Sequence, residues 1–299
     1  GRHNLLMIGP PGAGKTMIAR RIPGILPKMT EEEALEVTKI YSVRGLLTES
    51  EAWMAERPFR NPHHTITPQG LAGGGMVPGP GEISLAHHGV LFLDELAEFR
   101  RETLEILRQP MEEHCVKLAR LAGNYEFPSD FMLVAAMNPC RCGYYPDLNR
   151  CHCTKGMVEQ YLKKISQPLL DRIDICVETK RVEYQDLIKE NPHQETSAEI
   201  RKRVVAAMER QQQRFAGTNI RYNSRIPAAL LTKYCRLSTK QKQYMESIYQ
   251  KLELTARSYH RILRVARTIA DMDGSDEILT RHLSEAVCYR NVDKKFWEG

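Results

Sequence analysis

Residues 9–16 have the types and spacing of a phosphate-binding loop. They fit the pattern G-x-x-x-x-G-K-[ST] in full. Glycines allow a tight turn that presents backbone N–H groups to an anion, and the start of a following helix adds partial positive charge. Lys15 can reach the β- and γ-phosphates of a nucleotide, and the Thr16 hydroxyl can bind Mg²⁺. The predicted nucleotide-binding residues are Gly9, Pro10, Pro11, Gly12, Ala13, Gly14, Lys15 and Thr16.

Two acids follow a second apolar run, residues 90–93, in the Walker B pattern of nucleotide hydrolases. Asp94 would help to hold Mg²⁺, and Glu95 would act as the general base that activates water. The alternative is a capping role at the start of a helix expected over residues 96–109.

Asn138 ends a third apolar run, residues 131–136. A polar side chain at the carboxyl end of a strand faces the ligand crevice of an open α/β sheet. Asn138 can therefore reach the γ-phosphate or the attacking water. An ordinary asparagine between strand and loop is the alternative.

A cysteine cluster follows at once, as two C-x-C pairs separated by eight residues: Cys140, Cys142, Cys151 and Cys153. Four thiolates could close a tetrahedral, purely structural Zn²⁺ site that braces the loop after Asn138. C-x-C is less typical of zinc than C-x₂-C, so free thiols and a disulfide remain alternatives. The histidine pairs at 63–64 and 87–88 are interpreted as structural or surface residues, because the side chains of neighbouring residues on a strand point to opposite faces of the sheet.

The surrounding pattern predicts an α/β fold. Apolar runs at 5–8, 90–93, 131–136 and 173–177 are typical of buried parallel strands. Residues 57–64, which contain two prolines, are at most an edge strand. A first helix should stop before Pro23, a capping box at Thr30 should start a second, and residues 116–127 should form a hairpin. We expect a nucleotide-binding core over 1–194, with a glycine-rich insertion at 70–75. An all-α lid over 195–299 should hold helices at 197–214, 227–237, 239–252, 256–272 and 280–290.

Composition narrows the class of protein. The 299 residues are 42% hydrophobic, and no apolar run approaches the ~20 residues of a membrane span. No secretory signal is visible, so we expect a cytoplasmic protein with its 8 cysteines reduced or metal-bound. The opening of the chain on its first strand suggests a fragment. Residues 195–299 carry 20 Lys+Arg against 12 Asp+Glu, which indicates either a polyanionic partner or a solvated helical surface.

Five segments together resemble the magnesium-chelatase-like AAA+ ATPases, in particular the YifB/ComM group. They are residues 9–16, 70–75, 80–95, 135–140 and 169–174. The resemblance implies an AAA+ αβα core with a helical lid, assembled as a homo-oligomeric ring, usually a hexamer, with nucleotide between subunits. It also implies a DNA motor of the ComM type, which promotes branch migration during natural transformation. ComM-type proteins carry a Lon-protease-like domain ahead of the ATPase, and its absence from these residues would fit an excised fragment.

The resemblance also implies roles for single residues. Asn138 would be sensor 1, Arg172 the arginine finger that enters the neighbour's site, and Arg257 sensor 2, with Arg261 one turn further on. Lys117 and Arg120, on a hairpin that faces the ring pore, would contact DNA phosphates. The alternatives are surface salt bridges for the arginines and an ordinary exposed face for the hairpin.

The sequence is compatible with three functional hypotheses. The leading hypothesis is a Mg-ATP-hydrolysing ring motor on DNA, with Lys15, Glu95, Asn138, Arg172 and Arg257 as the catalytic set. The second is a chelatase-like AAA+ subunit that remodels a protein partner. The third is a nucleotide-gated scaffold with negligible turnover, against which the intact Glu95 argues.

Overall fold

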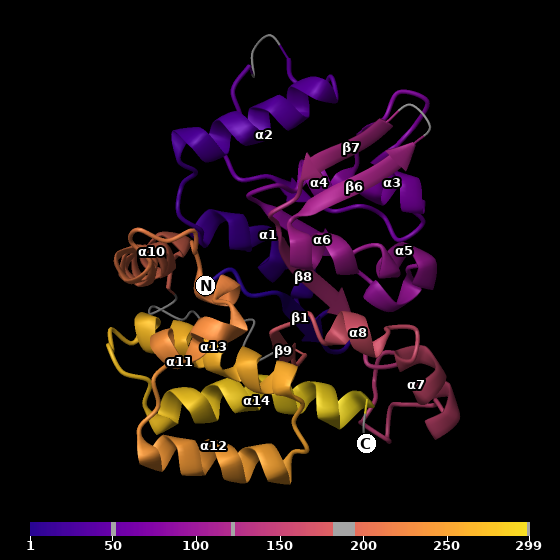
Figure 1. Ribbon diagram of the computed structural model, residues 1–299. Coiled ribbons are helices and arrows are strands. Elements are labelled where there is room, and N and C mark those ends of the chain that lie inside the picture. Colours follow the sequence, from indigo (N-terminus) through magenta and orange to yellow (C-terminus); the bar gives the residue numbers. More distant parts are fainter. Residues whose placement is uncertain (49–51, 121–122, 182–194, 298–299) are drawn as a thin grey trace.

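The computed structural model describes residues 1–48, 52–120, 123–181 and 195–297. An α/β part built on one sheet is followed by an all-helical part, which lies below it in Figure 1. Both classes were predicted. The boundary expected at 194/195 adjoins residues 182–194, which lie outside the described residues.

The sheet has five parallel strands in the order β2-β5-β8-β1-β9. Their bounds are β2 Phe59–Arg60, β5 Val90–Leu93, β8 Met132–Met137, β1 Leu5–Ile8 and β9 Ile175–Glu178. Ile8 pairs with Met137 and Leu93 with Ala135, so β1, β5 and β8 end at one edge. The loops that carry the predicted site therefore leave the sheet side by side.

Helices cover both faces of this sheet. On one face α1 (Lys15–Ile25) packs its buried Ala19 and Ile22 against Met7 and Phe92. The other face meets α3 (Pro68–Ala72), α4 (Glu82–Leu85), a 3₁₀ turn η1 (Leu96–Glu98), α5 (Arg101–Glu105), α6 (Arg108–Glu113), α7 (Lys155–Leu162) and α8 (Gln167–Leu170). Neighbouring strand residues alternate between the two clusters, as a sheet buried on both faces requires. This is the predicted αβα sandwich.

Two predictions about helices of the α/β part are wrong. α1 does not stop before Pro23 but continues to Ile25, since a proline in the last turn removes only one helical hydrogen bond and Ile22 stays packed on the sheet. The helix expected over 96–109 is broken into η1, α5 and α6. Phe99 and Arg100 between them have extended backbones, and the bend lets Phe99 enter the core.

The remaining core elements agree with expectation. The capping box at Thr30 starts α2 (Glu31–Val43). β3 (Gly73–Gly74) and β4 (Gly79–Pro80) pair within the glycine-rich insertion, and Met76 is exposed at its tip. β6 (Cys115–Arg120) and β7 (Gly123–Pro128) form the predicted hairpin.

The helical part has its own hydrophobic core. Its elements are α10 (Ser197–Arg214), η2 (Asn223–Arg225), η3 (Ala228–Leu230), α11 (Leu231–Tyr234), α12 (Thr239–Lys251), α13 (Ala256–Met272) and α14 (Thr280–Trp297). The helix predicted over 227–237 is split into η3 and α11. α10 packs on α1 and α14 on β9. Within the described residues, the helices are all too short or too polar to cross a membrane.

Candidate active site

The phosphate-binding loop joins the end of β1 to the start of α1. Gly12 and Gly14 have positive φ angles of 78° and 74°, which favour glycine. A Cβ on Gly9 would lie 2.1 Å from Thr179 Oγ1, so no side chain fits there. The loop thus has the tight, side-chain-free backbone that an anion needs to approach its N–H groups.

Lys15 points its ammonium into this loop. Its Nζ donates to Gly9 O at 2.6 Å, to Pro10 O at 2.9 Å and to Asn138 Oδ1 at 3.2 Å. Burial lowers the pKa of Lys15, and the nearby Asp94 carboxylate opposes that shift. The structure therefore brings Asn138, from the end of β8, to the lysine of the loop.

Thr16 and Asp94 meet directly beside the lysine. The Thr16 hydroxyl donates to Asp94 Oδ2 at 2.7 Å, from the first turn of α1 to the end of β5. A hydroxyl and a carboxylate oxygen in contact are the hard ligands that Mg²⁺ prefers, together with phosphates and water. The residues present therefore fit a Mg-nucleotide. The capping alternative does not hold for η1, which has no side-chain cap.

Glu95 has a left-handed backbone, with φ 51° and ψ 47°. Such a conformation is costly for a residue with a side chain, and it is found at functional sites. Its carboxylate is largely exposed, and its Oε2 lies 3.3 Å from Nδ1 of His64. His64 follows the edge strand β2, and no sequence signal pointed to this pairing.

The prediction that paired histidines face opposite ways is wrong, because neither pair lies within a strand. The ring centroids are 4.1 Å apart for His63 and His64 and 3.9 Å for His87 and His88. Nε2 of His87 and Nε2 of His88 both approach Oε2 of Glu36, at 3.0 and 2.8 Å.

These three side chains could be taken for metal ligands. However, the backbone N–H of Asp130 donates to His87 Nδ1 at 2.9 Å. The proton of the neutral His87 ring therefore sits on Nε2 and points at Glu36, which leaves no lone pair for a metal there. Burial lowers the pKa of His87 to about 4, helped by the adjacent His88, so the ring is neutral near pH 7. The cluster is a hydrogen-bonded support, as the structural interpretation expected.

Arg172 lies at the opposite edge of the sheet. The Asn4 side chain, just before β1, donates to Arg172 O at 2.9 Å. The four residues of β1, about 13 Å of extended chain, separate that edge from the phosphate-binding loop. The guanidinium of Arg172 is mostly buried and pairs with Glu112, with Nη2 and Oε1 2.6 Å apart.

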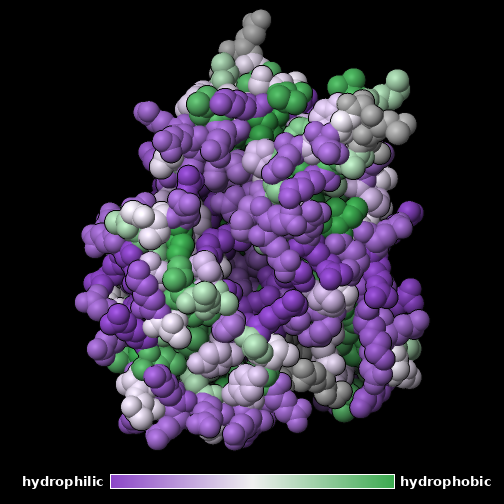
Figure 2. Space-filling model, in the orientation of Figure 1, coloured by the Kyte–Doolittle hydropathy of each residue, from purple (hydrophilic) through white to green (hydrophobic). Residues whose placement is uncertain are grey.

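Arg172 and Arg257 line the same pocket, although one follows α8 and the other begins α13. The pocket has a volume of about 600 Å³ and a strongly basic lining, and Figure 2 shows it as a hydrophilic hollow in the middle of this face. Further basic side chains in the lining are Arg2, His114, Arg221, Arg225, His260, Arg261 and Arg264.

Arg257 and Arg261 differ in what they contact. Arg261 is mostly buried, donates to Ile173 O at 3.3 Å and lies 3.7 Å from Asp174 Oδ1. Burial lowers the pKa of Arg261 to about 10, against the attraction of Asp174. Arg257 is exposed and has no hydrogen bond or ion pair with any residue that the structure describes. Of the two arginines, Arg257 is the one available to a partner.

The hairpin residues proposed for DNA are placed differently. Lys117 is exposed, but its Nζ lies 2.8 Å from Glu113 Oε2 and it pairs across the strands with Glu126. Arg120 is the last residue of β6, and its side chain lies outside the described part of the structure. The described part of the hairpin is therefore not strongly basic.

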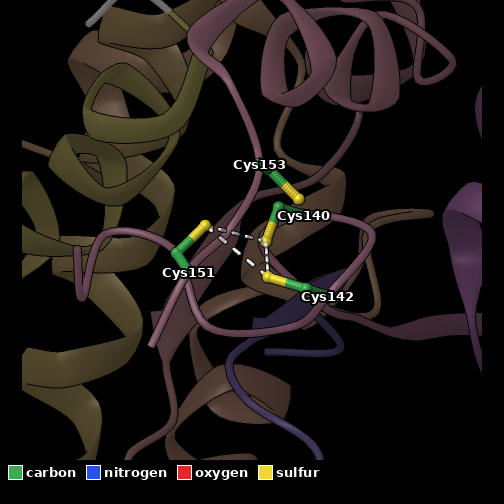
Figure 3. A group of neighbouring side chains, drawn as sticks. All are labelled: Cys140, Cys142, Cys151 and Cys153. Carbon is green, nitrogen blue, oxygen red and sulfur yellow. Dashed lines mark hydrogen bonds between the residues drawn. The ribbon is translucent and has the colours of Figure 1, made fainter. Parts of the chain in front are cut away.

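The four clustered cysteines converge as free thiols (Figure 3). Sγ of Cys140 lies 3.3 Å from that of Cys142 and 3.7 Å from that of Cys151, and Cys142 and Cys151 are 3.6 Å apart. All four sulfurs, including that of Cys153, lie within 4.8 Å of one another. A ZnS₄ tetrahedron with bonds of about 2.3 Å has edges of about 3.8 Å. The cluster could therefore bind Zn²⁺. The structure has four free thiols here, and not the disulfide that was the alternative.

Comparisons with known proteins show the family to which this chain belongs. The family described as "Magnesium chelatase, subunit ChlI" matches residues 1–187, and "Magnesium chelatase, subunit ChlI C-terminal" matches residues 194–290. Among curated proteins, Escherichia coli YifB is 45% identical over 294 residues, which are 98% of this chain and 57% of YifB. Haemophilus influenzae competence protein ComM is 42% identical over 290 residues, 97% of this chain and 56% of ComM.

An uncharacterized protein of Mycobacterium tuberculosis is 38% identical over 293 residues, 98% of this chain and 58% of that protein. The chain thus spans a little more than half the length of these relatives. The matched families cover nearly all of its residues, including both edges of the sheet and the helical part. This chain therefore belongs to the magnesium chelatase subunit ChlI family of AAA+ ATPases.

Proposed function

We propose that this chain is the ATP-hydrolysing part of a homo-oligomeric ring, expected to be a hexamer, that moves DNA. One observation supports the proposal of a ring. The carboxyl edge of the sheet brings together Lys15, Thr16, Asp94 and Asn138, whereas Arg172 lines a pocket at the amino edge. An arginine so placed cannot serve the loop of its own subunit. It can serve a neighbour's in a head-to-tail ring, which is the way such assemblies close.

Within that ring, the residues would divide the reaction as follows. Lys15 and the loop N–H groups bind the phosphates, and Thr16 with Asp94 would hold Mg²⁺. A Mg²⁺ ion held there would neutralise negative charge on the phosphates of the nucleotide. Glu95 accepts the proton of the attacking water, which requires it to turn from His64, and Asn138 orients that water.

The neighbouring subunit completes the site. Its Arg172 stabilises the charge of the transition state, a contribution of ~10³–10⁵ in rate for an arginine finger. We assign Arg257 to the same interface, because it lines the same pocket and is exposed. Since Arg172 is held by Glu112, the neighbour's phosphate has to displace that carboxylate.

DNA is the substrate that we propose, on three supports. One relative is named competence protein ComM, the ComM group implies branch migration, and residues 195–299 carry the basic excess. Lys117 and Arg120 are the proposed phosphate contacts. The pairing of Lys117 with Glu113 favours the second candidate, a chelatase-like subunit that remodels a protein partner.

ATP hydrolysis with and without forked and single-stranded DNA at low salt tests the proposal, with oligomer size recorded in parallel. A several-fold stimulation in a ring-sized species supports a DNA motor. Replacing both Lys117 and Arg120 with alanine should then reduce the stimulation and leave the basal rate unchanged. A ring whose rate DNA does not change would favour the protein-remodelling alternative.

We further propose that Cys140, Cys142, Cys151 and Cys153 hold one structural Zn²⁺, and that residues 1–194 and 195–299 are separate domains. The thiols form a closed set of four ligands, so such a metal would have no open position for catalysis. Zinc rather than a multi-iron cluster fits, because sulfurs 3.3–3.7 Å apart already touch and leave no space for bridging sulfides.

A further inference from the structure

We infer that the four-cysteine site supports the phosphate-binding loop, so that zinc occupancy sets the affinity for nucleotide. The inference rests on the proposed zinc site and goes beyond it. A merely structural zinc would affect folding alone. Here the metal would tie together the chain segments that form the back of the nucleotide site.

Gly143 is the first link between the two sites. It follows Cys142 directly, and a Cβ on it would lie 2.7 Å from Pro11 Cδ and 3.8 Å from Asn138 Cγ. Its backbone, with φ +88°, therefore packs against the phosphate-binding loop with no room for a side chain. Its N–H donates to Cys140 O at 3.0 Å, which fixes this backbone to the first ligand of the cluster.

Asn138 is the second link. Only Pro139 separates it from Cys140, which is completely buried. The Asn138 side chain accepts from Lys15 at 3.2 Å. Cys140 thus lies two residues from Asn138, which contacts Lys15. Cys142 directly precedes Gly143, which contacts Pro11.

The other side of the cluster is anchored to the rest of the fold. The N–H of Tyr145 donates to Cys140 Sγ at 3.4 Å, the kind of outer-shell contact that orients a metal ligand. The Tyr145 ring meets the Phe296 ring of α14, with centroids 6.3 Å apart. The Trp297 indole donates to Leu162 O at the end of α7 at 3.0 Å. The cluster therefore lies between the phosphate-binding loop and the end of the helical part.

These contacts explain why the metal matters to the loop. A Zn²⁺ ion would join residues 140–142 to residues 151–153 and hold Gly143 against Pro11. Without it, no bond joins the two C-x-C pairs, and the chain between them is held mainly by local turns. Gly143 can then move away, and the backbone that meets the phosphates loses its support.

The first experiment uses the wild-type chain. Metal content is measured by atomic emission, and the dissociation constant of a fluorescent ADP analogue is measured before chelation, after chelation and after adding back Zn²⁺ or Mg²⁺. We expect one zinc per chain and an affinity about 10-fold or more weaker without it, the scale of losing an outer-shell support. Zn²⁺ should restore the affinity, and Mg²⁺ should not. Circular dichroism checks that the chelated chain stays folded.

Substitutions separate the metal from the contact. Gly143→Ala keeps all four thiols and should weaken nucleotide binding to a similar extent at wild-type zinc content. Leu148→Ala lies in the same loop with its side chain 81% exposed, and Cys288→Ser removes an exposed thiol outside the cluster. Both controls should bind zinc and nucleotide like the wild type.

The outcomes are distinguishable. A chain that contains zinc but binds nucleotide equally well after chelation and with Gly143→Ala overturns the coupling and leaves the zinc proposal standing. A pure chain without zinc, and with no uptake of added Zn²⁺, overturns both.

Discussion

Mixing two inactive variants tests whether the two edges of the sheet act in different subunits. Lys15→Ala removes the ammonium at the carboxyl edge, and Arg172→Ala removes the guanidinium at the amino edge. Each variant alone should be nearly inactive, with a loss of ~10³–10⁵ for Arg172→Ala. In a mixed ring, the intact loop of an Arg172→Ala subunit can face the intact arginine of a Lys15→Ala subunit. That interface contains every catalytic group.

The size of the recovery follows from this geometry. In a random equimolar ring the loop comes from the correct variant half of the time, and so does the arginine. About one quarter of the interfaces in a head-to-tail ring are then complete. If interfaces work independently, the mixture should reach about a quarter of the wild-type rate, at least ~100-fold above either variant given the finger's contribution. The rate should be greatest near an equal mixture.

The assay is steady-state ATP hydrolysis at constant total protein over a range of mixing ratios. Fluorophore-labelled subunits confirm that they exchange, and light scattering confirms the ring. Lys15→Ala mixed with Glu95→Gln is the matched control, because both defects lie at the carboxyl edge and no interface becomes complete. A mixture of Lys15→Ala with Arg172→Ala that exchanges subunits yet stays as inactive as its components would refute the shared site.

Three further predictions follow from the same structure. Glu95→Gln should lower turnover by ~10²–10⁴, the contribution of a general base, and should keep the affinity for an ADP analogue; an unchanged low rate would instead indicate a scaffold. Gly9→Ala should abolish nucleotide binding and lower the urea midpoint, because its Cβ would lie 2.1 Å from Thr179 Oγ1. The Cβ of Gly12→Ala meets no atom within 4 Å, so this variant should lose only the ~1–3 kcal/mol of stability that a strained backbone costs. Finally, burial is the chief reason that the pKa of His87 is lowered to about 4. Between pH 6.5 and 4 the unfolded chain therefore binds a proton at this residue that the folded chain does not, and the stability of the fold depends on pH. The free energy of unfolding should therefore fall on acidification by up to about 1.4 kcal/mol per pH unit from this group. Urea titrations of His87→Gln should show a shallower slope, and an unchanged slope would contradict the assignment.

The parts of the molecule that the sequence predicts are those that local chemistry determines. The loop of Gly9 to Thr16 and the strands around it follow from apolar runs and a motif of fixed spacing. The bounds of α10 and α13 follow from the helical period, and the structure shows Thr196 and Thr255 as their N-caps. The proximity of Asn138 to Lys15 could be predicted because parallel strands end at one edge.

Contacts between distant segments could not be predicted in this way. His64 meets Glu95, and Glu112 meets Arg172, only because the packing of the elements brings them together. Gly143 is one glycine among 19 in the sequence until the structure places it on Pro11. The break between η1 and α5 was also hidden, since buried leucines at helical spacing suit a continuous helix as well as a bent one.

The helical part connects the two edges of the sheet within one subunit. Arg201 of α10 donates to Gly24 O at 2.6 Å, near the end of the helix that begins with Lys15 and Thr16. Arg225 of η2 donates to Asp130 Oδ1 at 2.6 Å, at the amino edge. The same helical part presents Arg257 to the pocket that it shares with Arg172. A movement of α1 when nucleotide binds would therefore be passed to an arginine that faces the next subunit. The contacts supply the physical continuity that coupling between neighbouring sites requires, and a mixed-ring rate that departs from the quarter expected for independent interfaces would show that the coupling operates.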